Sequence, residues 1–327
     1  MRNVRTDIAV EAHEYYTGDG RNIPPGVEVT NQDYGGVHYS KVVITSEEGG
    51  QALHKPIGTY ITIDAPGIKD GTDEGKDQAA ALLARELELL LLANGVKEDD
   101  EVLVVGLGNW NVTPDALGPK TISRLMVTRH LFEFMPHVMD KGMRPVCALA
   151  PGVLGITGIE TGEIVRGVSE KIMPKAIIAI DALASMKTER LGTTLQITDS
   201  GINPGSGVGN NRKVLDKATL GIPVIAVGVP TVVDAATIAD DAIDIAISKM
   251  QEQANPNLQS FNMLKAMNEE DRYTLIHEAI GSGLLNMIVT PKEIDEMIDD
   301  IADVIADGIN MGLHKGIDME NSAKYLN

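Results

Sequence analysis

The stretch that decides the fold runs from Val102 to Pro119 and reads Val-Leu-Val-Val-Gly-Leu-Gly-Asn-Trp-Asn-Val-Thr-Pro-Asp-Ala-Leu-Gly-Pro. It opens with an uninterrupted apolar run, and a second such run, 176–180, leads directly into Asp181. Short apolar runs of this kind predict strands buried on both faces, as in a parallel sheet. Because ligands of open α/β sheets bind beyond the carboxyl ends of the strands, we expect Asp115 and Asp181 to meet there. Two close carboxylates do not both ionise cheaply, so one tends to keep a proton while the other acts as a base.

The composition of the chain limits the partners and the cellular compartment that we expect for it. Of 327 residues, 43% are hydrophobic, which is enough for a substantial core, and 28 Lys+Arg against 47 Asp+Glu give a net charge of −19. Such a charge disfavours a nucleic-acid surface and an anionic membrane, so we expect neither as a direct partner. The one cysteine, Cys147, allows no intrachain disulfide and suits a reducing compartment as a buried, inert thiol. With a polar start at 1–7 and no apolar run of ~18 residues, the chain is expected to be cytoplasmic.

The alternation of apolar runs and helical patterns predicts an α/β fold. We expect a three-layer arrangement with an open, mostly parallel sheet, helices on both faces and a C-terminal helical extension. Residues 1–40 have the composition of a loop-rich arm. The strands are expected at 41–45, 57–63, 101–105, 145–149, 176–180, 193–197 and 223–228. The helices are expected at 72–94, 116–135, 160–172, 231–249, 268–280 and 290–307.

The glycine-rich motifs do not match nucleotide-binding patterns. Gly106 and Gly108 follow a strand, but the third glycine of the dinucleotide motif would fall at Asn111. We interpret them as a tight turn that leads a loop into the cleft, where Gly106, Gly108 and Asn109 are possible oxyanion or substrate contacts. The loop 199–211 is not a Walker loop, and its Gly205 and Gly207 are possible contacts of the same kind, the alternative being an ordinary surface loop.

No other catalytic pattern is present in the sequence. The seven histidines form no metal-binding pair, and there is no Gly-x-Ser-x-Gly, so we expect no metal and no cofactor. The chemistry that is left belongs to carboxylates. Alone, Asp115 also suits a helix N-cap and Asp181 a turn at the end of a strand.

Several long strings resemble the spore germination proteases of endospore-forming bacteria. They are 104–119, 179–185, 199–210 and 4–11, and the resemblance extends over almost the whole chain. That family is similar in fold to the hydrogenase maturation proteases and is regarded as a group of atypical aspartic peptidases. The resemblance implies that Asp115 and Asp181 are the catalytic pair.

The resemblance also implies a biological setting. The family's substrates are the small acid-soluble proteins that coat spore DNA, and its members are homotetrameric zymogens of the forespore or spore core. They remove a short N-terminal segment themselves, cutting after an acidic residue and before a hydrophobic residue followed by Ala. Asp7-Ile8-Ala9 fits this rule, which predicts a prosegment at 1–7. Because the composition changes after residue 250, we expect a peptidase domain at 8–250 and a helical extension at 251–327, packed on the same domain or at an oligomer contact.

The expected mechanism is activation of a water molecule by an aspartate pair that shares a proton. Two alternatives stay open at this point. One keeps the fold but uses the acidic site to recognise a metal ion, as the hydrogenase maturation proteases do. The other is a non-enzymatic, acidic binding scaffold.

Overall fold

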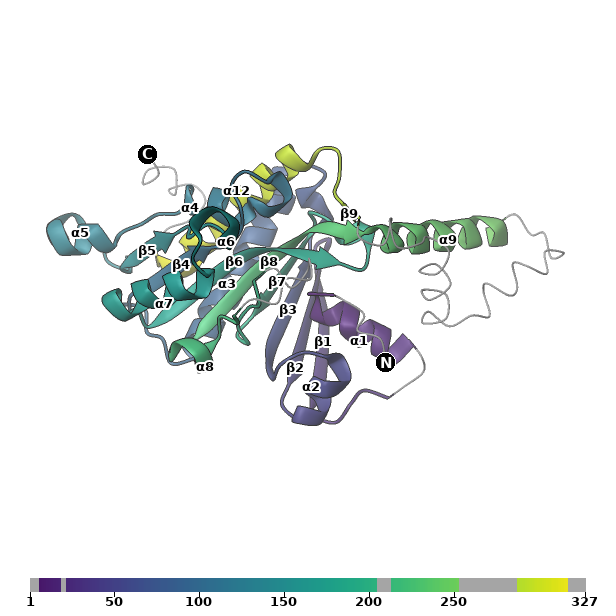
Figure 1. Ribbon diagram of the computed structural model, residues 1–327, viewed down its shortest axis with the longest axis horizontal. Helices are drawn as coiled ribbons and strands as arrows, with labels where there is room; N and C mark the ends of the chain where they lie inside the picture. Colours follow the sequence, from purple (N-terminus) through teal and green to yellow (C-terminus); the bar gives the residue numbers. More distant parts are fainter. Residues whose placement is uncertain (1–5, 19–21, 205–212, 253–286, 317–327) are drawn as a thin grey trace.

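The computed structural model describes residues 6–18, 22–204, 213–252 and 287–316, and in them one mixed sheet forms the middle of the molecule (Figure 1). The strands follow one another across this sheet in the order β1-β2-β3-β7-β8-β6-β4-β5, and β9 pairs with β8. Their bounds are β1 Val27–Tyr34, β2 Val37–Ile44, β3 Gly58–Asp64, β4 Val102–Gly106, β5 Val146–Leu149, β6 Ala176–Ser185, β7 Thr194–Thr198, β8 Val224–Asp234 and β9 Ile288–Val289.

Helices and short 3-10 turns connect these strands. The α-helices are α1 Ala9–Gly18, α2 Glu47–Leu53, α3 Asp73–Ala93, α4 Leu117–Ile122, α5 Arg129–Phe134, α6 Leu154–Thr157, α7 Thr161–Ile172, α8 Lys217–Leu220, α9 Ala235–Glu252 and α12 Ile294–Leu313. The 3-10 turns are η1 Pro66–Ile68, η2 Thr113–Asp115, η3 Pro136–Val138 and η4 Thr188–Arg190. No helix among the described residues is both long and apolar enough to cross a lipid bilayer.

The sheet has a parallel half and an antiparallel half. β5, β4, β6 and β8 pair in parallel, which follows from the helical crossovers between them. β1, β2, β3 and β7 add antiparallel strands on the other side of β8. The open α/β fold predicted from the sequence is confirmed, and the candidate site belongs to its parallel half.

Helices cover both faces of the sheet, each packed by its apolar stripe. On one face, α3, α4 and α12 bury side chains against alternate residues of the central strands, such as Val104, Ile180 and Val227. On the other face, α7 and α8 cover the parallel half, and α1 and α2 cover the antiparallel half (Figure 1). The three-layer arrangement thus leaves the middle of this second face, over β7 and β8, between two groups of helices.

Three local expectations differ from the structure, and a fourth is untested. Residues 1–40 are not an arm, because they contain α1, β1 and the first part of β2. The helix expected at 116–135 is broken into α4 and α5, since Thr128 between them is buried and its backbone N–H donates to the Val146 carbonyl at 2.9 Å. β6 and β8 run on to Ser185 and Asp234, so part of the helix expected at 231–249 is strand. The helix expected at 268–280 lies outside the described residues.

Candidate active site

Three glycines allow the loop after β4 to pack tightly against η2 and α4. A Cβ on Gly106 would lie 2.3 Å from the Gly118 carbonyl oxygen, and one on Gly118 would lie 2.3 Å from the Leu107 carbonyl oxygen. Gly108 has a φ of +114°, and a Cβ there would lie 2.0 Å from the Asp115 carbonyl oxygen. Any side chain at these positions would push the two segments apart. The glycines therefore set the position of Asp115.

Hydrogen bonds hold Asp115 and its turn in place. The Asn109 backbone N–H donates to Asp115 Oδ2 at 2.8 Å and also to the Asp115 carbonyl oxygen at 3.0 Å. The Thr231 hydroxyl of β8 donates to the Pro114 carbonyl at 2.8 Å, and Thr290 donates to the Thr231 carbonyl at 2.9 Å. η2 is thereby tied to the strand that also pairs with β6.

Asp181 lies inside β6 rather than at its end. β4 stops opposite Ile180, whose carbonyl accepts the Leu107 N–H at 2.8 Å, whereas β6 continues beside β8 as far as Ser185. The expectation of a strand end at Asp181 is therefore wrong, although Asp181 still follows the carboxyl end of its neighbour β4. Its side chain is buried, with the residue 5% exposed, and Oδ1 accepts the Ala182 N–H at 3.0 Å.

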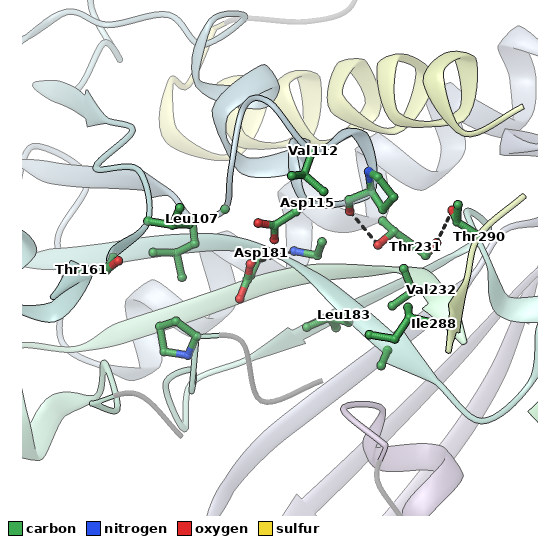
Figure 2. A pocket seen from close by; sticks show the side chains of 16 residues that line it. Leu107, Val112, Asp115, Thr161, Asp181, Leu183, Thr231, Val232, Ile288 and Thr290 are labelled. Atoms are coloured by element: carbon green, nitrogen blue, oxygen red, sulfur yellow. Dashed lines mark hydrogen bonds between the residues drawn. The ribbon is translucent and has the colours of Figure 1, made fainter. Parts of the chain in front are cut away.

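The two aspartates line one cavity of about 410 Å³. Figure 2 shows Asp115 entering it from η2 and Asp181 from β6, with apolar side chains around them. The apolar lining includes Leu107, Val112, Leu183, Val232 and Ile288. The structure thus brings together the two carboxyl groups singled out in the sequence, in a cavity that suits an apolar ligand group.

A second, more polar cavity of about 530 Å³ adjoins the first one, and the two share Leu183 and Ala184. Two of its lining residues, Gln196 and Gly228, belong to a row across the sheet in which Thr62 pairs with Gln196, Gln196 with Gly228, and Gly228 with Asp181. Sequence reasoning missed this row, because the sheet order that aligns β3, β7, β8 and β6 is not apparent from the chain. It also missed Lys55, which enters this cavity from the segment after α2.

The predicted self-cleavage residues contact Leu183 and Ala184, the two residues that both cavities share. The Asp7 N–H donates to the Ala184 carbonyl at 3.3 Å, and the Ala184 N–H donates to Asp7 Oδ2 at 3.0 Å. Ile8 is fully buried and packs with Val10 and Leu183. The Asp7–Ile8 bond therefore lies beside Ala184, which is three residues after Asp181 in β6.

The remaining predicted contacts are distributed unevenly. Gly108 lines the first cavity, but Gly106 and Asn109 are not among its lining residues. Gly205 and Gly207 lie outside the described residues.

Cys147 is half-buried, and burial raises the pKa of its thiol to about 11. Within the ranges that the structure describes, no three His, Cys, Asp or Glu side chains are grouped as metal ligands.

Comparison with known proteins shows to which protein family the chain belongs. The germination protease family model matches residues 6–264 and 251–326. The chain belongs to the germination protease family. It is 46% identical over 327 residues to the germination protease of Clostridium tetani, which covers 99% of this chain and 100% of that protein. It is also 48% identical over 295 residues to that of Caldanaerobacter subterraneus subsp. tengcongensis, covering 90% and 89% of the two chains.

A more distant germination protease, from Bacillus subtilis, is 42% identical over 356 residues, covering 98% of this chain and 96% of that protein. Matches of this extent establish that the chain is a protease of spore germination. The resemblance stated from the sequence is confirmed.

Proposed function

We propose that the chain is an endopeptidase of the atypical aspartic type, with Asp115 and Asp181 as its catalytic residues. The observation that carries this proposal is the cavity that both carboxyl groups line, one from η2 and the other from β6. Their supports are independent, since the Asn109 N–H holds Asp115 and the Ala182 N–H holds Asp181. Rigid supports of this kind keep two reacting groups oriented at little entropic cost.

The proposed chemistry needs one water molecule and one shared proton. The ionised carboxylate takes a proton from the water molecule while the water oxygen attacks the carbonyl carbon of the peptide bond. The protonated carboxyl donates to the departing nitrogen as the carbon–nitrogen bond breaks, so the products are a carboxylic acid and an amine. General acid–base assistance of this kind contributes about 10²–10⁴-fold for each group.

The substrates that we propose are the small acid-soluble proteins that protect spore DNA, cut between an acidic residue and a hydrophobic residue followed by Ala. The apolar lining of the first cavity favours this rule, because it offers an apolar surface to a hydrophobic side chain. The chain contains such a sequence itself, at Asp7-Ile8-Ala9. The protein would act in the forespore or spore core, as a homotetramer.

We further propose that the chain is a zymogen that removes residues 1–7 by its own activity. The support is the pairing of Asp7 with Ala184, in the strand that carries Asp181. Mass spectrometry before and after mild acidification is expected to show loss of the first seven residues and a new N-terminus at Ile8. An unchanged N-terminus in a sample that cleaves added substrate would contradict this step.

The catalytic pair is tested by Asp115→Asn and Asp181→Asn. Each change keeps the shape of the side chain but removes its acid–base function, so kcat for a spore-protein substrate is expected to fall at least about 10²-fold. Asp216→Asn is the matched control, because Asp216 caps α8 outside the cavity and accepts the Thr219 N–H at 2.7 Å. Circular dichroism checks that all three variants are folded. Near-normal cleavage by either cavity variant would overturn the assignment.

A further inference from the structure

The second cavity differs in chemistry from the one that holds the aspartates. Its lining includes the neutral polar side chains of Gln196, Thr198, Ser200 and Asn203, and these surround a lysine. A cation in such a place is notable in a chain whose net charge is −19. Because the two cavities meet at Leu183 and Ala184, a peptide bound across the aspartates would extend into the second one.

Lys55 is built into this cavity rather than displayed on the surface. Its backbone N–H donates to the Gly50 carbonyl at 3.0 Å, which fixes the turn after α2. Its ammonium group donates to the Thr6 carbonyl at 2.8 Å. The side chain is half-buried, and burial lowers the pKa of the ammonium group, while the charges of Asp7 and Glu11 oppose that shift.

Of these two acids, Glu11 is already held by other groups. It accepts from the Ser185 hydroxyl at 2.7 Å and from the Met186 N–H at 3.0 Å, and it lies 3.3 Å from the Arg190 guanidinium. Asp7 lines the same cavity as Lys55, and its Oδ2 accepts the Ala184 N–H at 3.0 Å. The N-terminal segment therefore places Asp7 in the same cavity as Lys55. It also places the carbonyl of Thr6 within hydrogen-bonding distance of the Lys55 ammonium group.

We propose that the second cavity is the subsite for the acidic residue that precedes the cut bond, and that Lys55 determines this specificity by binding the acidic side chain. The proposal rests on the proposed peptidase function and assigns a role that the aspartate pair cannot fill. In the described structure Asp7 lines this cavity, its Oδ2 accepts the Ala184 N–H at 3.0 Å, and its charge acts on the Lys55 ammonium group. When residues 1–7 leave, Lys55 loses its hydrogen bond to the Thr6 carbonyl and the nearby charge of Asp7. An incoming substrate then supplies a carbonyl and an acidic side chain in their place.

The test compares two peptides on four full-length proteins. The peptides copy residues 2–14, one with Asp7 and the other with Asp7→Asn, and the proteins are the wild type, Lys55→Met, Lys55→Arg and the control Lys69→Met. Lys69 is exposed at the end of η1 and lines neither cavity. The protein's own segment competes equally with both peptides, so the ratio of their kcat/KM values is independent of its occupancy.

The wild type, Lys55→Arg and Lys69→Met are expected to cut the Asp7 peptide about tenfold better than the Asn form, mainly through a lower KM. In Lys55→Met the ratio is expected to fall to about one. A purely structural role for Lys55 would lower both rates and leave the ratio intact. A ratio that stays near tenfold in Lys55→Met would overturn the proposal.

A binding measurement separates this subsite from the peptidase function. Peptides that copy residues 2–7, ending in Asp or in Asn, are titrated into the same four proteins and followed by calorimetry. Preference for the Asp peptide that disappears in Lys55→Met supports the subsite even if no peptide is cut, a result that would count against the peptidase proposal alone. Cleavage without any acidic preference, or equal binding of both peptides to the wild type, would overturn the subsite alone.

Discussion

At the scale of single residues, the position of Asp115 depends on three glycines, which have no side chain. Gly106, Gly108 and Gly118 have no Cβ, and this lets the segment after β4 approach η2 closely enough to fix Asp115. Gly106 and Gly108 follow a strand, as the first two glycines of a dinucleotide motif do, but Asn111 replaces the third, and their role here is close packing of backbone against backbone. The same physical property, freedom from a side chain, serves two different purposes in the two kinds of site.

This role predicts the effect of Gly108→Ala. The new Cβ would collide with the Asp115 carbonyl at a φ of +114°, so we expect a loss of at least about 2 kcal/mol in unfolding free energy. Protease activity is expected to fall with it, because Asp115 is displaced. Gly36→Ala is the matched control: Gly36 has a φ of +104° but nothing within 4 Å of its Cβ position. It should lose about 1–2 kcal/mol by urea unfolding and keep its activity; equal activities of the two variants would refute the packing role.

Residue patterns in the sequence identified Asp115 and Asp181 but not Lys55 or Thr231. The aspartates follow apolar runs, which indicate buried strands of a parallel sheet in the chain itself. Lys55 and Thr231 are ordinary residues in their local contexts and acquire a role only through contacts with Thr6 and Pro114. Such contacts depend on the order of strands in the sheet, which local patterns do not encode.

At the scale of elements, the site depends on two strands that are longer than their neighbours. β6 and β8 pair beyond the end of β4, with an irregularity between Leu183 and Ala184, and the overhang forms the wall that both cavities share. Apolar runs predicted where β6 and β8 begin, but not where they end. The ends depend on mutual pairing, and Pro230 inside β8 reads locally as a strand breaker.

β8 also positions η2, which predicts the effect of Thr231→Val. The change removes the hydrogen bond to the Pro114 carbonyl and leaves that acceptor without it, so unfolding free energy is expected to fall by about 1–3 kcal/mol. Because η2 carries Asp115, kcat should fall more than KM changes. Ser169→Ala serves as the control, since its buried hydroxyl bonds the Val165 carbonyl within α7 at 2.7 Å. A Thr231→Val enzyme that loses stability but keeps its full kcat would show that β8 does not orient Asp115.

At the scale of the whole molecule, the C-terminal end of α12 is locked to the parallel half of the sheet. His314 is fully buried there, where Nδ1 accepts the Arg144 N–H at 3.2 Å and Nε2 contacts the Met126 carbonyl oxygen at 3.3 Å. Burial lowers the pKa of this imidazole to about 4, and the nearby Arg144 charge acts in the same direction. These contacts therefore stabilise the neutral form of the His314 imidazole.

This buried ring makes stability depend on pH. The unfolded chain takes up the His314 proton near pH 6.5, whereas the folded chain resists it down to about pH 4. The contribution of His314 is therefore intact above pH 6.5 and is lost as the pH falls towards 4, a change of about 3 kcal/mol. His314→Gln, which keeps a donor and an acceptor but does not titrate, should flatten the urea-unfolding profile over this range. Parallel profiles for the two proteins would contradict this assignment.

The aspartate cavity draws its lining from positions between Leu107 and Thr290, so it is complete only when this whole stretch of the chain has been made. Asp115 and Asp181 are translated long before Thr290, whose hydroxyl completes the chain of contacts through Thr231 to η2. A nascent chain on the ribosome therefore carries both acids without the scaffold that orients them. With the two acids as the proposed catalytic pair, we expect proteolysis to begin only after residue 290 has emerged and folded, which would protect the unfinished chain and its neighbours from premature cutting.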